Sequence, residues 1–349
     1  MNNKAGLYIH IPFCKNKCPY CDFYSKKYCE NEAEDYCKRL INQMQDFEGE
    51  FDTVYFGGGT PSIIKEELIG EILSAAKSRF DIDKNSEITL ECNPSKDLKE
   101  SFQKYASYGV NRISLGMQSA VDKERFALGR SAGKVQVEKA VLDAKNAGIE
   151  NVSLDLMLGT PKQTLASLDE TFDFIDKMDV RHISAYMLKI EEGTRFFEMQ
   201  NRLELPSDDE VSEMYLKTIS VLGQLGFDQY EISNFAKKGC ESRHNLKYWE
   251  LDEYLGLGIS AHSFWKGKRF YTDENFSIIP DGDGGSKEER IMLGLRLKKG
   301  INKKLITKDY QPFIDMGYLE EKGESLALTP KGMLVSNTVI CALLPETTE

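Results

Sequence analysis

The chain has 349 residues, and its 45 Lys and Arg against 56 Asp and Glu give a net charge of −11. Hydrophobic residues make up 41% of it and aromatic residues 10%, enough for a folded core and too much for a disordered chain. The acidic balance argues against a general nucleic-acid binder, because affinity for phosphate needs clustered basic residues. No apolar run reaches the roughly 18 residues of a membrane span. We therefore expect a cytoplasmic protein without a transmembrane segment, whose eight cysteines are reduced, metal-bound or catalytic.

Short apolar runs alternate with segments of helical periodicity along most of the chain. The expected strands are Leu7–Ile11, Thr53–Phe56, Glu87–Cys92, Arg112–Met117, Asn151–Leu158 and His182–Ile190. Apolar residues recur at helical spacing in Glu66–Phe80, Thr164–Met178 and Ser207–Gly226, and Gln229–Phe235 is again strand-like. Strand–helix units of this kind favour a parallel sheet with right-handed crossovers. The predicted fold class is α/β, with a partial (β/α)6 barrel.

The last part of the chain differs from the rest. Pro, Gly and Asp interrupt all periodicity in Ile279–Ser286, which predicts a linker. Beyond it, residues 287–349 carry ten basic and nine acidic side chains, and a short hairpin is expected to end near Leu326–Thr329. We expect a small helical or winged-helix-like domain, whose near-neutral charge makes a poor surface for DNA.

Three cysteines follow the first expected strand directly. Cys14, Cys18 and Cys21 are separated by three and two residues, so that their thiolates can converge on one metal centre. Three protein ligands on a four-iron cluster leave one iron open for another ligand. The spacing alone also allows a zinc site completed by Cys29, Cys37 or a histidine, or three unrelated thiols.

The CxxxCxxC spacing resembles the radical S-adenosylmethionine (SAM) superfamily. The residues before it, Tyr8 to Phe13, resemble the branch that contains oxygen-independent coproporphyrinogen III oxidases and HemW-type heme chaperones. The resemblance continues through Gly57–Pro61, Glu91–Pro94, Leu115–Ser119, Leu128–Arg130, Asp155–Pro161 and His182–Tyr186. Their order and spacing together argue against chance and against a zinc site. The resemblance implies a radical SAM barrel over residues 1–235, an extension over 236–280 and a HemW-type C-terminal domain over 287–349.

The resemblance also implies a set of cofactors and site residues. Cys14, Cys18 and Cys21 would bind a [4Fe-4S] cluster, and the positions that match SAM contacts are Tyr8, Tyr20, Gly58, Gly59, Thr60, Glu91, Gln118, Arg130 and Asp155. Carboxylates suit the ribose hydroxyls and a guanidinium suits the methionine carboxylate of SAM. Glycines after a strand let backbone groups approach a ligand closely. The implied chemistry is reductive cleavage of SAM to methionine and a 5′-deoxyadenosyl radical, and we assign no catalytic side chain.

Three features favour the chaperone over the oxidase. Phe23 stands where the oxidase motif has a fourth cysteine, and only thirteen residues precede Cys14. The run His244-Asn-Leu-Lys-Tyr248-Trp249 matches the HNxxYW motif of HemW, for which heme binding has been proposed. His244 is then a candidate heme ligand, although a histidine beside aromatic residues is also a common packing residue. The expected partners are heme, an acceptor protein and an electron donor for the cluster. The oxidase, and a structural metal protein without SAM, remain as alternatives.

Some positions depart from the family pattern or carry weaker signals. Ala132 stands where relatives commonly have a histidine, and Leu158 and Thr160 replace an aromatic residue and a leucine. Among the other histidines, we expect His10 near the cluster loop, His182 as structural and His262 as a candidate for the cavity wall. Cys240 is a packed thiol or a second candidate heme ligand. The thiols of Cys29, Cys37, Cys92 and Cys341 are expected to be reduced and structural.

Overall fold

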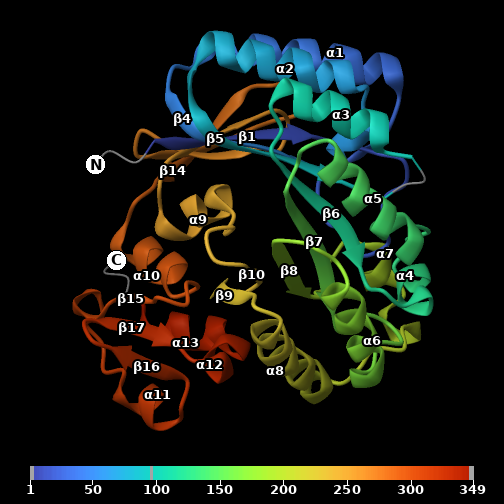
Figure 1. Ribbon diagram of the computed structural model, residues 1–349. Helices are drawn as coiled ribbons and strands as arrows, with labels where there is room; N and C mark the ends of the chain where they lie inside the picture. Colours follow the sequence, from blue (N-terminus) through green and yellow to red (C-terminus); the bar gives the residue numbers. More distant parts are fainter. Residues whose placement is uncertain (1–3, 95–96, 346–349) are drawn as a thin grey trace.

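The computed structural model describes residues 4–94 and 97–345 of the chain. The outer ends of the first and last expected domains, residues 1–3 and 346–349, lie outside the described residues. One large sheet dominates the molecule, with helices against it and a smaller C-terminal part beside it (Figure 1).

Seven neighbouring strands of the large sheet run parallel. In spatial order they are β11 (Tyr254–Leu257), β1 (Ala5–Ile11), β4 (Glu50–Gly58), β5 (Asp81–Cys92), β6 (Arg112–Gln118), β7 (Asn151–Leu158) and β8 (His182–Met187). The last six are the strands expected from the sequence, in chain order, so the predicted α/β fold class is confirmed. Because parallel strands end at one edge, the residues that follow them meet there.

Side-chain alternation divides each strand into two chemical faces. On β1, Leu7 and Ile9 are fully buried in the core, while Tyr8 and His10 alternate with them. On β7, Val152 and Leu154 are likewise buried in the core, whereas Asp155 belongs to the opposite set. The apolar set packs under the helices, and the other face of the curved sheet is lined by polar groups.

Antiparallel strands extend the sheet at both edges. Beyond β8 lie β10 (Asn234–Ala236) and β9 (Asp228–Glu231), and beyond β11 lie β12 (His262–Trp265), β13 (Lys268–Thr272) and β14 (Ile278–Asp283). The single strand expected at Gln229–Phe235 is therefore a hairpin. The linker prediction for Ile279–Ser286 was wrong over residues 279–283, because β14 pairs with β13 despite Pro280. A proline is tolerated there because β14 is an edge strand.

Helices follow the strands as the sequence predicted. They are α1 (Glu30–Gln43), α2 (Glu66–Arg79), α3 (Lys99–Tyr108), α4 (Asp122–Ala127), α5 (Lys134–Asn146), α6 (Leu165–Asp176), α7 (Arg195–Glu198) and α8 (Asp208–Gln224). In Figure 1, α1 to α3 cover the β1–β4–β5 part of the sheet and α5 and α6 follow round β6 to β8. The side chain of Ser207 accepts a hydrogen bond from the backbone of Glu210, which confirms the N-cap predicted for α8.

The C-terminal part is a small unit of helices around a three-stranded sheet. It contains α10 (Lys287–Gly294), β15 (Ile301–Asn302), α11 (Gln311–Asp315), β16 (Leu319–Lys322), β17 (Ser325–Leu328), α12 (Pro330–Leu334) and α13 (Ser336–Leu343). The β16–β17 hairpin confirms the one expected near Leu326. Helix α9 (Arg243–Glu250) lies between this unit and the sheet (Figure 1).

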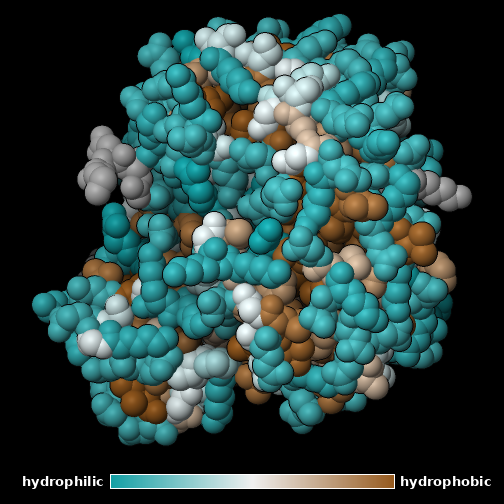
Figure 2. All heavy atoms as spheres, in the orientation of Figure 1, coloured by the Kyte–Doolittle hydropathy of each residue, from teal (hydrophilic) through white to brown (hydrophobic). Residues whose placement is uncertain are grey.

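The outer surface is mainly hydrophilic on the face drawn in Figure 2, where apolar atoms gather chiefly over the α4–α6 side. Within the described part of the chain, none of the helices combines the length and apolarity that crossing a bilayer requires.

Candidate cofactor site

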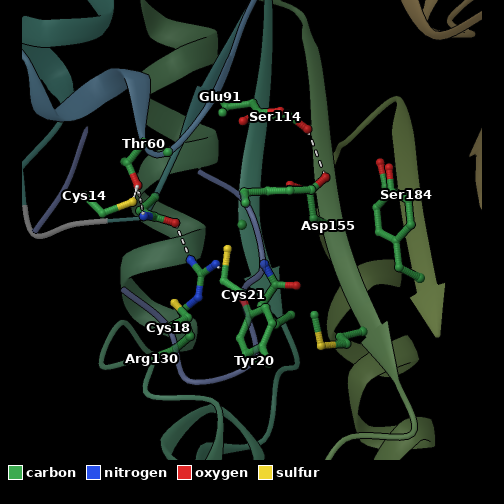
Figure 3. Close-up of a pocket in the computed structure, with 18 of the residues that line it drawn as sticks. Cys14, Cys18, Tyr20, Cys21, Thr60, Glu91, Ser114, Arg130, Asp155 and Ser184 are labelled. Atoms are coloured by element: carbon green, nitrogen blue, oxygen red, sulfur yellow. Dashed lines mark hydrogen bonds between the residues drawn. The ribbon is translucent and has the colours of Figure 1, made fainter. Parts of the chain in front are cut away.

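One cavity of about 450 Å³ opens at the carboxyl ends of the parallel strands. Eleven of the thirteen site residues expected from the sequence line it: Cys14, Cys18, Tyr20, Cys21, Gly58, Gly59, Thr60, Glu91, Gln118, Arg130 and Asp155. They come from the cluster loop, from β4 to β7 with the residues directly after β4, and from the loop between α4 and α5, which carries Arg130. Figure 3 shows the cysteines facing Glu91 and Asp155 across the cavity. Tertiary structure therefore assembles the set that the motifs indicated.

The cluster loop begins at β2 (Phe13–Cys14), which pairs with β3 (Lys26–Lys27). All three loop cysteines are free and half-buried, and the backbone N–H of Cys21 donates to the carbonyl of Cys18 at 3.1 Å. Burial raises the pKa of the Cys21 thiol. Three soft sulfur donors on one cavity wall fit a [4Fe-4S] cluster, with room left for a further ligand.

A single metal ion fits less well. Among residues 4–94 and 97–345, no group of three or more His, Cys, Asp and Glu side chains is arranged to hold one. A four-iron cluster places its own irons and sulfides between the thiolates, so these need not converge on a point. Cys29 is exposed and Cys37 is buried, and neither lines the cavity.

The glycines at the end of β4 and directly after it are required by their neighbours in the protein. Gly58 has φ of +109°, and a Cβ atom on it would lie 2.6 Å from the ring of His10. A Cβ on Gly59 would lie 2.6 Å from the carbonyl oxygen of Phe13. This oxygen belongs to the backbone, so no side-chain rotation can relieve the clash. The backbone N–H of Thr60 donates to that same carbonyl at 2.8 Å. These residues therefore bind the β4 turn tightly to the cluster loop, besides bordering the cavity.

Arg130 organises the wall next to the cysteines. Its Nη2 donates to the hydroxyl of Tyr20 at 2.9 Å, and its Nη1 donates to the side-chain oxygen of Asn93. Asn93 in turn donates to Thr60 at 3.0 Å. Asn93 was not predicted as a site residue, although it lies in a motif that the sequence analysis singled out. The network holds the guanidinium in a fixed place, and its Nε is buried without a hydrogen-bond partner among the described residues.

Two carboxyl groups occupy the opposite wall. Tyr55 donates to Glu91 at 2.8 Å, and Ser114 donates to Asp155 at 2.9 Å. Burial raises the pKa of Glu91 to about 7, against the hydrogen bond from Tyr55. Burial likewise raises the pKa of Asp155 to about 6, against the hydrogen bond from Ser114. Both groups can accept hydrogen bonds from hydroxyls of a bound ligand, and burial moves the ionisation of both toward neutral pH.

His244 and Tyr8 lie beneath the cavity and do not line it. The ring of His244 stacks on Tyr55 at a centroid distance of 5.1 Å, and Tyr8 lies against both rings. The Nδ1 of His244 is hydrogen-bonded to Thr53 and its Nε2 to Tyr248, each at 2.8 Å. Burial lowers the pKa of His244 to about 3, so the ring is neutral and its single lone pair is engaged. Binding to heme iron would require breaking one of these bonds.

The HNxxYW run forms α9 and anchors it below the cavity. The carboxylate of Glu87 accepts hydrogen bonds from the first backbone N–H groups of α9, those of Arg243 and His244, at 3.1 and 3.0 Å. At the other end, the ring of Trp249 lies 4.3 Å from the guanidinium carbon of Arg296 in the C-terminal unit. Asn245 reaches the cavity wall. The motif thus connects the barrel interior with the C-terminal unit.

The remaining histidines and cysteines have simpler positions. His182 is buried, with Ser153 and Tyr230 each 2.8 Å from its ring nitrogens, which agrees with a structural role. His262 is exposed on β12 and stacks on Tyr271, so the expectation that it lines the cavity was wrong. Cys240 precedes α9 and also lies outside the cavity wall.

Comparison with known proteins agrees with this architecture. The Radical SAM superfamily model matches residues 8–175, and the HemN C-terminal domain model matches residues 287–335. Heme chaperone HemW of Lactococcus lactis is 32% identical over 96% of this chain and 96% of its own length. Heme chaperone HemW of Bacillus subtilis is 33% identical over 98% of this chain and 99% of its own. The chain belongs to the HemW family of radical SAM proteins.

Among solved structures, coproporphyrinogen III oxidase (HemN) from Escherichia coli superposes with a TM-score of 0.83 at 18% identity, over 98% of this chain and 91% of that one. At that identity the match shows the shared fold alone.

Proposed function

We propose that this protein is a heme chaperone that binds a [4Fe-4S] cluster, SAM and heme and delivers the heme to an acceptor protein. The observation that carries the proposal is the near full-length similarity to curated HemW heme chaperones. The cavity supports it, because the three cluster cysteines and all the SAM candidates except Tyr8 line one cavity. Phe23 supports the chaperone over the oxidase, since no fourth cysteine stands at that position.

Within this proposal, each wall of the cavity binds a different part of the cofactors. Cys14, Cys18 and Cys21 would hold the cluster, and Arg130, fixed by Tyr20 and Asn93, would bind the methionine carboxylate of SAM. Glu91 and Asp155 would accept hydrogen bonds from the ribose hydroxyls. When bound, the cluster and SAM together supply the capacity for reductive cleavage to a 5′-deoxyadenosyl radical.

The proposed domains follow the expected boundaries, with the barrel over 1–235, the α9 extension over 236–280 and the C-terminal unit over 287–349. We propose a cytoplasmic location, an electron donor that reduces the cluster, and an acceptor protein as partners. The C-terminal unit, joined to the barrel through the contact between Trp249 and Arg296, is the proposed place for the acceptor.

The test uses anaerobically reconstituted full-length protein. We expect a four-iron absorption spectrum in the wild type and in Cys29→Ser, whose thiol is exposed and outside the cavity, and no such spectrum in Cys18→Ser. The wild type should bind hemin and pass it to an apo-acceptor. It should form no decarboxylated porphyrin when supplied with SAM, a reductant and coproporphyrinogen III. Repeated turnover of coproporphyrinogen III would contradict the chaperone assignment and favour the oxidase.

A further inference from the structure

Large apolar side chains surround the mouth of the cofactor cavity. Phe23 is 63% exposed, Tyr186 is 42% exposed and Met187 is 37% exposed, and all three line the cavity. Phe23 lies two residues after Cys21 in the cluster loop, whereas Tyr186 and Met187 are the last two residues of β8. Large apolar groups left partly exposed at the edge of a cavity indicate a ligand surface, since exposing them to water is unfavourable.

The size of the cavity limits what can lie inside it. A volume of about 450 Å³ is that of one small-ligand pocket, and its inner walls carry the groups proposed for the cluster and SAM. A heme macrocycle has no further enclosed space in this cavity. It can be accommodated across the mouth, where one of its faces would cover Phe23 and Met187.

The charged side chains at the mouth suit a flat ligand with apolar faces and carboxylates along one edge. Lys17 and Lys189 line the same opening, together with Asp22 and Glu191. Lys189 pairs with Glu191 at 2.5 Å. Lys17 makes no ion pair with any residue in the described ranges, so its ammonium group is available to a carboxylate of the ligand.

Met187 is the side chain at the mouth best suited to heme iron. A thioether is an established axial ligand of heme iron and needs no deprotonation. The alternative ligand, His244, is buried below the cavity with both ring nitrogens hydrogen-bonded. Met187 lies at the end of a strand, a rigid element, with its side chain partly exposed to an incoming ligand.

We propose that the mouth of the cavity is the heme site, where the macrocycle lies on the apolar patch of Phe23, Tyr186 and Met187, the thioether of Met187 binds the iron, and Lys17 pairs with a propionate. This inference rests on the proposed function as a heme chaperone. It has a kinetic consequence, because heme in this place covers the route into the cavity. SAM must therefore enter before heme.

The experiment titrates hemin into cluster-loaded full-length protein and into four variants at three exposed positions, where substitution leaves the core intact. Met187→Ala and Phe23→Ser should each weaken hemin binding by about tenfold or more. Met316→Ala, at a 53% exposed methionine in the C-terminal unit, is the matched control and should bind hemin as the wild type does. Met187→His should restore binding with a nitrogen-ligated spectrum in place of the thioether-to-iron band. Bound hemin should slow SAM uptake in the wild type.

The outcomes separate the inference from the function on which it rests. If the wild type binds no hemin, the chaperone proposal fails. If the wild type binds hemin and both Met187→Ala and Phe23→Ser bind it equally well, only the location is wrong. If these variants keep their hemin affinity but no longer transfer heme, the patch docks the acceptor protein, and the heme site proposed here is overturned.

Discussion

Replacing Glu91 by Gln should stabilise the cofactor-free protein at alkaline pH while weakening SAM binding. Folding raises the pKa of Glu91 from its ordinary 4.5 to about 7, so the folded chain retains a proton there that the unfolded chain has released. The contribution of this group to stability is complete below about pH 4.5 and is lost as the pH rises through 7. The difference between the two pKa values corresponds to about 3 kcal/mol, at about 1.4 kcal/mol for each pKa unit. Glutamine does not ionise, and its carbonyl oxygen can still accept the hydrogen bond from Tyr55.

The measurement is urea unfolding of the wild type and Glu91→Gln, both without cluster, at pH 4.5 and pH 8. We expect closely similar stabilities at pH 4.5 and a Glu91→Gln protein about 3 kcal/mol more stable at pH 8. Glu150→Gln, at an exposed carboxylate, is the control and should show no such pH-dependent gain. A difference between Glu91→Gln and wild type that does not change with pH would show that Glu91 carries no burial penalty. Equilibrium dialysis with cluster-loaded protein should show weaker SAM binding by Glu91→Gln. The wild-type carboxylate would then bind SAM at the expense of the stability of the folded protein.

Three further substitutions test other parts of the site. Gly59→Ala should lower the iron content after reconstitution, because the new methyl group would lie 2.6 Å from the backbone of the cluster loop. Gly223→Ala is the control and should keep full iron content, because a Cβ at that position meets no atom of another segment within 4 Å among the described residues. Thr53→Val should cost about 1–2 kcal/mol in thermal unfolding, because it leaves the Nδ1 of buried His244 without its partner, and an unchanged melting temperature would contradict that view of the histidine. Arg130→Lys should raise the Kd of SAM about tenfold with the cluster spectrum unchanged, since a lysine cannot reproduce the forked contact, and equal SAM affinity would place the methionine carboxylate elsewhere.

The sequence determined the parts of this protein that depend on local pattern. Strand β7 has the bounds expected from its apolar run, and the N-cap of α8 at Ser207 is where the Ser-Asp-Asp-Glu pattern predicted it. The cysteine spacing and the motifs at strand ends also indicated the cavity wall, because parallel strands bring their carboxyl ends to one edge whatever connects them. Glu91 and Asp155 therefore meet in one cavity, as their places in the sequence implied.

The tertiary structure alone decided which partners these groups receive. The sequence could not show that β11 pairs with β1, since Leu255 and Leu7 are brought together only when the sheet forms. It could not distinguish a heme-binding His244 from a packed one, because the answer depends on Thr53, nearly two hundred residues earlier in the chain. The exposure of Met187 was likewise hidden, since a strand pattern does not show where the sheet leaves a cavity open. Periodicity is set between near neighbours, whereas hydrogen-bond partners, burial and the mouth of a cavity are set by contacts between distant segments.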